Sequence, residues 1–195
     1  SAASDVYKRQ QLGNGDTSST NEKFHDNDTT DGIYAAQKVY RGESAATNDD
    51  WYIQDVIDIA AGKSFSVALK ADGTVWTWGD NTYGQLGDGT KITRGYPIQV
   101  KFQNGRDDSA STFGGNNAAT AIAAGNNHLL ILANGVVYAV GDNSKGQLGN
   151  GATGTTESIV VPVMIDETTT LTGVKNIAAG DDFSMALLED GSVYA

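Results

Sequence analysis

Two glycine-rich segments have residue types that could bind phosphate. Gly84 to Lys91 reads GQLGDGTK and has the glycine spacing of a P-loop, and Gly146 to Thr153 repeats that spacing as GQLGNGAT. A phosphate cradle needs a lysine directly before Ser or Thr at the start of a helix. The first segment instead ends in Thr-Lys, and the second contains no lysine. Both segments are therefore interpreted as turns of a repeated unit.

Histidine and tryptophan side chains are the next candidates for chemistry. His128 could serve as a general base or as a ligand. The corresponding positions of two related segments hold Phe65 and Phe183, which favours a buried packing histidine. Trp76 and Trp78 could form an aromatic binding platform, but their positions in an expected strand favour the core.

Acidic residues supply the remaining candidates. The segment from His25 to Gly32 suggests calcium binding, but an EF-hand reading puts Lys38 where a bidentate glutamate is required, so a solvated acidic loop is expected. Acidic pairs in expected loops are the candidate partner-binding residues, with a solvated, solubilising surface as the alternative. These pairs are Asp49 and Asp50, Asp107 and Asp108, and Asp181 and Asp182.

The sequence assigns no catalytic, cofactor-binding or metal-ligating residue. It contains neither a Gly-x-Ser-x-Gly nor a His-Glu-x-x-His motif, and no cofactor is expected. A pair of catalytic carboxylates is still possible, because any two aspartates can meet in the folded chain.

Composition excludes several classes of partner. The formal net charge of −11 argues against nucleic acid and anionic membranes, because phosphate binding needs clustered Lys and Arg; acidity favours a basic protein partner instead. No cysteine is present, which excludes disulfides and thiolate sites. No apolar run reaches the roughly 18 residues of a membrane span. The compartment stays open, because no targeting segment is recognised.

The elements that must position these residues belong to a repeated unit. The stretch from Ala60 to Thr90 recurs from Ala123 to Thr153 and, cut short, from Ala178 to Ala195, while Gln11 to Thr17 matches the end of the unit. Repetition at intervals of roughly 60 residues indicates an array, a solenoid or a propeller.

The sequence pattern of each unit predicts a pair of antiparallel strands. Apolar residues alternate at Phe65, Val67 and Leu69, and the residues between them are also small or apolar, as expected for strands buried on both sides. The turn residues that follow suit a type I′ hairpin; they are Asp72-Gly73, Asn134-Gly135 and Asp190-Gly191. Additional short strands are expected at 96–100 and 161–165, and about four strands per unit suggest the blade of a β-propeller.

The motifs Ala-Ala-Gly-x-x-[His/Phe], Asp/Asn-Gly-x-Val-[Trp/Tyr] and Gly-Asp-Asn-x-x-Gly-Gln-Leu-Gly together resemble the RCC1 (regulator of chromosome condensation) repeat. The resemblance covers nearly all of Val56 to Ala195. It implies an all-β fold, a partial β-propeller with about three repeats of a seven-bladed ring. Phe65 and Phe183 replace the usual histidine of the family, and Val140 replaces the Trp found at Trp78; both departures are interpreted as packing exchanges.

The expected organisation has five parts. They are a non-native leader at 1–10, the end of a first repeat with an irregular acidic insertion at 11–55, RCC1-like repeats at 56–118 and 119–173, and a truncated repeat at 174–195.

The leading functional hypothesis is a non-catalytic scaffold that binds a protein partner through its blade loops. The resemblance implies guanine nucleotide exchange on a small GTPase as an alternative, although no residue here can be matched to that activity. A third reading is the propeller module of a larger secreted or cell-surface bacterial protein.

Overall fold

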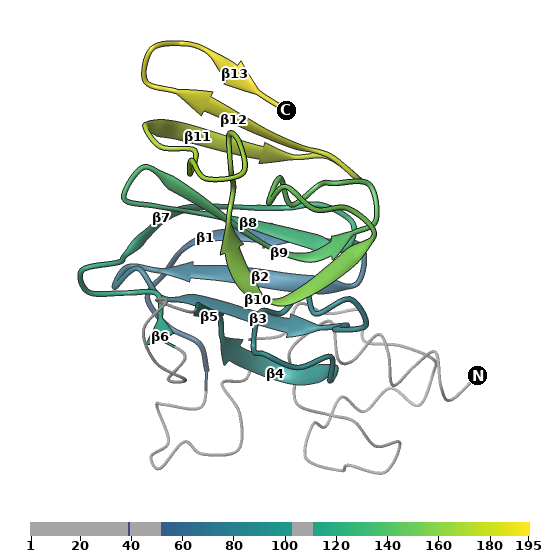
Figure 1. The fold of residues 1–195 in the computed structure, drawn as a ribbon. Helices are drawn as coiled ribbons and strands as arrows, with labels where there is room; N and C mark the ends of the chain where they lie inside the picture. Colours follow the sequence, from purple (N-terminus) through teal and green to yellow (C-terminus); the bar gives the residue numbers. More distant parts are fainter. Residues whose placement is uncertain (1–38, 40–51, 103–110) are drawn as a thin grey trace, which may run out of the picture.

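The computed structural model of the 195-residue chain describes residues 39, 52–102 and 111–195, and the regular structure of these residues is entirely β (Figure 1). The strands form three sheets. The first blade contains β1 (Val56–Ala61), β2 (Phe65–Lys70), β3 (Val75–Gly79) and β4 (Arg94–Gln99). The second blade contains β7 (Ala119–Ala124), β8 (His128–Ala133), β9 (Val136–Asn143) and β10 (Thr155–Pro162). The third blade contains β11 (Val174–Ala179), β12 (Ser184–Leu188) and β13 (Val193–Tyr194).

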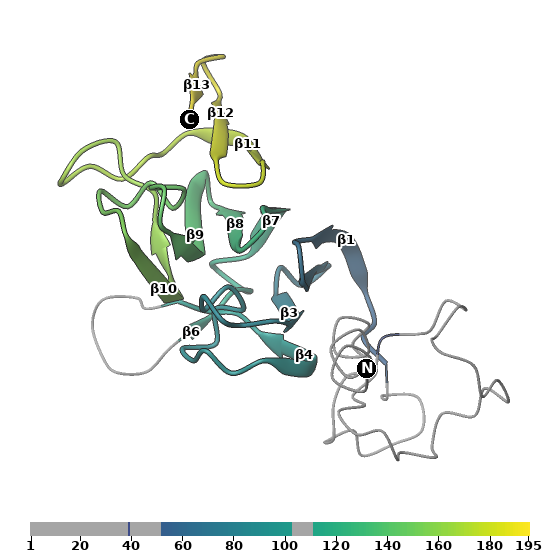
Figure 2. The same ribbon diagram turned by 90° about the vertical axis from the view of Figure 1, so that its right-hand side faces the viewer.

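The three blades fan out from a line along which their first strands meet (Figure 2). β7 contacts both β1 and β11, and neighbouring strands within each blade are antiparallel. Sheets that radiate from a common axis with their faces in contact form a β-propeller. The fold is therefore a partial β-propeller, as the repeats predicted.

Apolar clusters fill the spaces between blades, because the strands alternate apolar residues on both faces. One cluster joins the first and second blades, and the other joins the second and third. All six residues of β8 are buried, since this strand lies in the blade that is covered on both sides. The leading buried members of the first cluster are Phe65, Val67, Leu69, Phe113, Leu129 and Ile131, and those of the second are Leu130, Leu132, Leu148, Leu171 and Ile177.

Backbone hydrogen bonds fix the spacing of the blades at one end. The N–H of Lys63 donates to the carbonyl of Asn126 at 3.0 Å, and the N–H of Asn126 donates to the carbonyl of Asp181 at 3.0 Å. Each turn that follows a first strand is thus bonded to the corresponding turn of the next blade.

The hairpin turns are not all of one kind. Asn134 and Gly135 have φ angles of 52° and 73°, as the predicted type I′ turn requires. Gly73 and Gly191 have φ angles of 77° and 87°, but the aspartate before each is not in the positive region. These two loops contain three residues, a type I turn followed by a left-handed glycine. The type I′ prediction is therefore wrong for Asp72-Gly73 and Asp190-Gly191.

The segments between blades also pair with sheets. β5 (Lys101–Phe102) lies parallel to β10 through Phe102 and Val160, and β6 (Ser111–Thr112) pairs with β5. These strands extend the outer edge of the second blade, although they precede it in sequence.

A backbone hydrogen bond upstream of the first blade matches one upstream of the third blade. The N–H of Ile53 donates to the carbonyl of Val39 at 3.1 Å, just as the N–H of Leu171 donates to the carbonyl of Val163 at 2.8 Å. The chain that enters the first blade therefore has the same backbone pairing as the chain that enters the third.

Among the residues that the structure places, none belongs to a helix long and apolar enough to cross a membrane.

Candidate binding face at the loop end of the blades

Turns and loops from all three blades gather at one end of the molecule, which we call the loop end. It contains the turns at 62–64, 125–127 and 180–183 and the loops at 80–93 and 144–154, and it lies on the right in Figure 1. Loops that a rigid scaffold brings together commonly carry binding residues.

One asparagine holds each long loop in shape. In the first blade, the Asn81 Oδ1 atom accepts a hydrogen bond from the N–H of Leu86 at 3.0 Å. The Nδ2 atom lies 3.2 Å from the Asp88 Oδ1 atom and 3.0 and 3.2 Å from the carbonyl oxygens of Thr90 and Ile92. The side chain is fully buried, so these hydrogen bonds satisfy a polar group that water cannot reach.

The second blade repeats this arrangement. Asn143 accepts from the N–H of Leu148 at 3.0 Å and donates to the Asn150 side chain and the Ala152 carbonyl, both at 2.9 Å. The loop glutamines make equivalent hydrogen bonds in the two blades: the Gln85 side chain donates to Asp80 at 2.9 Å, and the Gln147 side chain donates to Asp142 at 3.2 Å.

This network leaves no phosphate cradle in the P-loop-like segment at 84–91. Several of its amide groups bond within the loop or to the next blade: the N–H of Leu86 to Asn81, that of Gly87 to the Gly84 carbonyl, and that of Gly89 to the Ser158 carbonyl. Within the described residues, the segment is followed by β4 and not by a helix. The interpretation as a repeated turn is therefore confirmed by the geometry.

The exposed positions of these loops differ from blade to blade. Thr82 and Tyr83 of the first loop correspond to Ser144 and Lys145 of the second, and all four are exposed. The buried Asn, Gln and Leu positions of the two loops are thus shared between blades, whereas the side chains presented to solvent vary.

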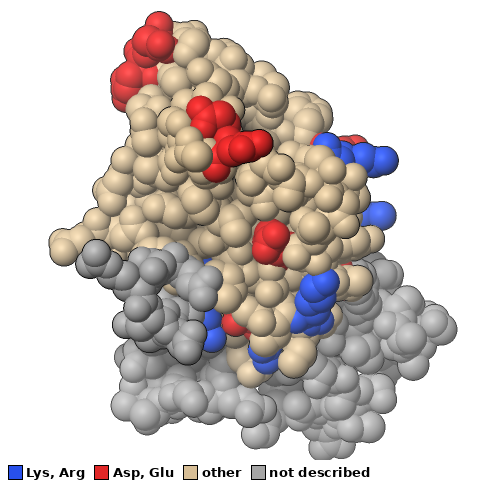
Figure 3. All heavy atoms as spheres, viewed as in Figure 1, with Lys and Arg blue, Asp and Glu red and all other residues tan. Residues whose placement is uncertain are grey.

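Charge also varies across the loop end. Figure 3 shows Lys and Arg gathered toward the right-hand side of this face of the molecule, with Asp and Glu over its upper and central parts. The first two blades contribute Lys63, Lys91 and Lys145 to the loop end, and the third contributes Asp181 and Asp182. A partner of the whole loop end must therefore match both signs of charge.

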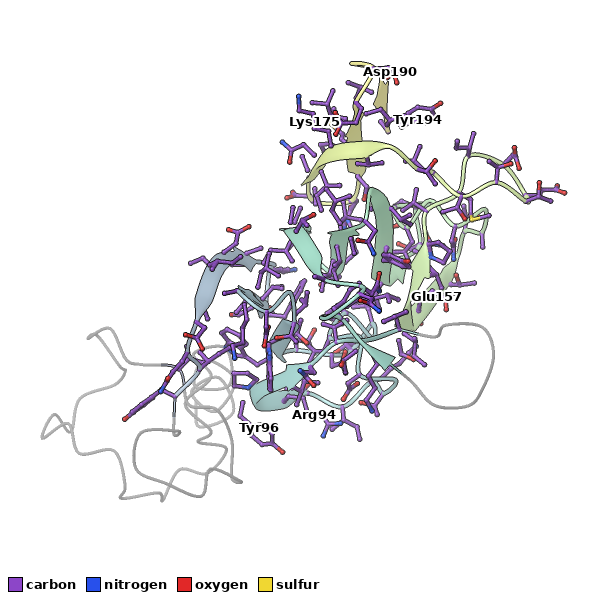
Figure 4. The ribbon with its side chains drawn as sticks, turned by 90° about the vertical axis from the view of Figure 1, so that its left-hand side faces the viewer. Arg94, Tyr96, Glu157, Lys175, Asp190 and Tyr194 are labelled. Atoms are coloured by element: carbon purple, nitrogen blue, oxygen red, sulfur yellow. The ribbon has the colours of Figure 1, made fainter. Side chains whose placement is uncertain are left out.

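An ion pair distinguishes the first blade. The Nε and Nη2 atoms of Arg94 donate to the Asp88 Oδ2 atom at 3.0 and 2.6 Å. Burial alone would raise the pKa of Asp88, but hydrogen bonds from Thr90 and Arg94 outweigh it and hold the pKa below its usual value. In the second blade Asn150 and Glu157 occupy these two positions, so the pair is absent there. Figure 4 shows Arg94 and Glu157 at their places on the two blades.

A hollow of about 290 Å³ opens between the second loop and the third blade. Lys145 and Asp182 line its polar part, and Phe183, Met185 and Tyr194 line its apolar part. Tyr194 lies on β13 at the outer side of the third blade (Figure 4). The hollow combines opposite charges with exposed aromatic side chains, which is a surface that suits a protein segment.

Comparison with known proteins agrees with the repeats and the fold. The family model described as "Regulator of chromosome condensation (RCC1) repeat" matches residues 72–132 and 134–187, and a second model of the same description matches 56–85 and 119–147. The chain belongs to the RCC1 repeat family.

Two RCC1-repeat relatives are much longer than this chain. The human E3 ubiquitin-protein ligase HERC2 is 33% identical over 140 residues, which cover 72% of this chain and 3% of HERC2. The RCC2 homolog of Danio rerio is 33% identical over 131 residues, which cover 67% of this chain and 23% of that protein. The crystal structure of human WBSCR16 has the same fold, with a TM-score of 0.57 and 18% identity over 80% of this chain and 38% of WBSCR16.

The RCC1 blades place the predicted acidic residues differently. Asp181 and Asp182 are exposed in the turn before β12 at the loop end, and Asp182 lines the hollow. The Asp181 backbone is engaged between blades through its carbonyl, while its side chain faces solvent. The other predicted pairs, Asp49 and Asp50 and Asp107 and Asp108, lie outside the described residues, as does His25.

Trp76 and Trp78 both lie on β3 of the first RCC1 blade. Trp78 is buried, and the half-buried Trp76 donates from its Nε1 atom to Thr74 Oγ1 at 3.0 Å. Their core role, favoured by the sequence, agrees with this placement.

His128 is completely buried, as the sequence predicted, but it has a partner that the sequence did not reveal. Its Nε2 atom lies 3.1 Å from the Ser184 Oγ atom of the third blade. This spacing fits a serine nucleophile and its base. However, Ser184 Oγ donates its only proton to the Gln147 carbonyl at 2.7 Å, so the imidazole must donate to Ser184 rather than accept from it. The only available signal was that Ser184 corresponds to Leu129 in the preceding unit.

Proposed function

We propose that this RCC1-repeat chain is a non-catalytic interaction module that binds a protein partner through the loop end. The observation that carries the proposal is that the two long loops share their buried polar residues but differ in their exposed ones. Asn81, Asn143, Gln85 and Gln147 are buried and hold the same loop shape twice, whereas the exposed positions carry different side chains. A constant frame with variable exposed residues is the usual construction of a repeat-protein binding surface.

The polarity of the Ser184–His128 contact supports a role without catalysis. A general base must accept the nucleophile's proton, but here the histidine donates and is sealed from solvent.

The loop end favours a partner with mixed charge. Asp181 and Asp182 would face basic groups of the partner, and Lys63 and Lys145 would face acidic groups. Such complementarity accelerates association and fixes the orientation of the partner more than it adds affinity.

The experiment is quantitative capture of partners from the source cell extract by the wild-type chain and by two charge-reversed variants. We expect Asp181→Lys with Asp182→Lys to lose the specific partner. Glu167→Lys with Glu189→Lys is the matched control, because these acidic residues are also exposed but lie outside the loop end. Equal capture by all three chains would contradict the proposal.

Nucleotide exchange on a small GTPase is a second candidate. The dog protein named X-linked retinitis pigmentosa GTPase regulator is 31% identical over 137 residues, which cover 70% of this chain and 12% of that protein. Release of labelled GDP from a small GTPase in the presence of the purified chain tests it. An unchanged release rate would remove this candidate and leave the interaction module standing.

A further inference from the structure

The two contacts between blades use different chemistry at one equivalent position. Between the first and second blades, Phe65 and Leu129 both belong to the apolar cluster. Between the second and third blades, the same positions hold His128 and Ser184, which are hydrogen-bonded to each other. Leu129 pairs with Ala124 and Ser184 pairs with Ala179, so the two positions have the same strand register. The second contact therefore contains an ionisable group that the first one lacks.

The hydrogen bonds determine which nitrogen of His128 carries the proton. Because Ser184 donates its hydrogen to the Gln147 carbonyl, the Nε2 atom of the ring must donate to the Ser184 oxygen. The Nδ1 atom then has no hydrogen. It is buried and has no hydrogen-bond partner in the described part of the chain.

The surroundings hold the ring in place. A Cβ atom at Gly125 would lie 2.1 Å from the ring Cε1 atom and 2.5 Å from both the Nδ1 atom and the Gly180 carbonyl oxygen. The imidazole thus packs directly on the turn backbone of its own blade, and the third blade closes over it. It cannot turn outward to become solvated without separation of the two blades.

Charged groups on both blades act on this ring. Burial lowers the pKa of His128 below its usual value, and the Asp142 and Asp182 carboxylates and the Phe183 backbone only partly oppose the effect. Asp142 lies on β9 of the same blade, and Asp182 lies in the turn before β12 of the third blade. The neutral imidazole is therefore the form that the docked blades accommodate.

We propose that His128 and Ser184 form a proton-sensitive latch between the second and third blades. When the Nδ1 atom takes a proton from solvent, the docked arrangement holds a buried cation that is protonated at an atom without a hydrogen-bond partner in the described part of the chain. Separation of the blades solvates the cation and uncovers the apolar cluster that contains Leu130, Leu132 and Ile177. The latch goes beyond the proposed binding role, because it couples exposure of an internal surface to pH.

The direction of the effect follows from proton linkage. The separated state binds a proton near the usual histidine pKa of about 6.5, whereas the docked state binds it only at lower pH. The docked state is therefore fully favoured above that pH. As the pH falls, the equilibrium constant for docking decreases by up to about tenfold per pH unit for one proton.

Two backbone amides report on the two contacts within one molecule. The Asn126 N–H donates to Asp181 across the second contact, and the Lys63 N–H donates to Asn126 across the first. We would measure their hydrogen-exchange protection by NMR from pH 7.5 to pH 5, corrected for intrinsic exchange. Protection of Asn126 should fall by up to about tenfold per unit below pH 6.5, while Lys63 stays constant.

The chain supplies its own control variant. His128→Phe with Ser184→Leu installs the pair used between the first and second blades, and we expect it to abolish the pH dependence at Asn126. If Asn126 protection is constant in the wild type, or falls equally in the variant, the latch is refuted.

A second measurement does not depend on the variant folding. The ¹⁵N shifts of the wild-type His128 ring should show the Nε2–H tautomer and no protonation while Asn126 remains protected. A charged His128 ring in molecules with a protected Asn126 would overturn the proposal.

Discussion

At the residue scale, a single buried asparagine in each long RCC1 loop both accepts and donates hydrogen bonds within that loop. Its amide accepts a hydrogen bond at one atom and donates at the other, and Asn81 uses both capacities inside one turn. Asn143 does the same in the second blade. The loops are therefore rigid because a buried polar group is fully used, and their exposed residues are free to vary.

Replacement of this asparagine by aspartate separates geometry from charge. Asn81→Asp keeps the acceptor but loses the donors, and it puts a carboxylate next to Asp88, whose Oδ1 atom lies 3.2 Å from Asn81 Nδ2. We expect a loss of about 3–5 kcal/mol in the free energy of unfolding, measured by urea denaturation at pH 7.

The matched control is Asn143→Asp, because the residue at the Asp88 position there is the uncharged Asn150. It should cost about 1–2 kcal/mol less than Asn81→Asp at pH 7. The difference should shrink near pH 4, where carboxylates begin to protonate. Equal costs at pH 7 would show that the carboxylate pair is solvated and that only the lost donors matter.

At the element scale, a glycine precedes each second strand of a blade for steric reasons. A Cβ atom at Gly62, Gly125 or Gly180 would lie 2.0 or 2.1 Å from the ring of the aromatic residue three positions later. None of the three has a positive φ, so their role is to make room for the ring. The turn and the strand that follows it are thus packed as one unit.

Two alanine substitutions test this packing in different surroundings. Gly125→Ala meets the buried His128 ring and the Gly180 carbonyl, and it should cost about 2–3 kcal/mol of stability in urea denaturation. At Gly180→Ala the nearest atoms all belong to Phe183, whose side chain is 56% exposed and can move away, so the cost should stay below about 1 kcal/mol. A large cost at Gly180 would mean that Phe183 is covered in solution.

The elements also show what could be learned from the sequence. The hairpin of β2 and β3 and its copies were predictable, because alternation and turn residues are local signals. The parallel pairing of Phe102 with Val160 was not, since it depends on how one blade stacks on the next. For the same reason, the sequence predicted that His128 is buried but not that Ser184 receives its hydrogen bond.

At the scale of the whole molecule, one position occurs in all three blades but in two environments. Ile122 and Ile177 are 8% and 9% exposed, because each packs against the preceding blade. Ile59, the equivalent residue of the first blade, is 75% exposed and borders a hollow of about 1090 Å³ that Trp78 also lines. Coverage by a neighbouring blade, rather than residue type, thus decides whether this isoleucine is part of a core.

The free energy of unfolding should follow that coverage. Ile122→Ala removes buried methyl groups and should cost about 2–4 kcal/mol, whereas Ile59→Ala should change stability by less than about 0.5 kcal/mol. Urea denaturation of the two variants, with analytical ultracentrifugation at the same concentrations, provides the comparison. If Ile59→Ala costs as much as Ile122→Ala, the outer face of the first blade is covered in solution, and a cost that grows with protein concentration would identify a second copy as the cover.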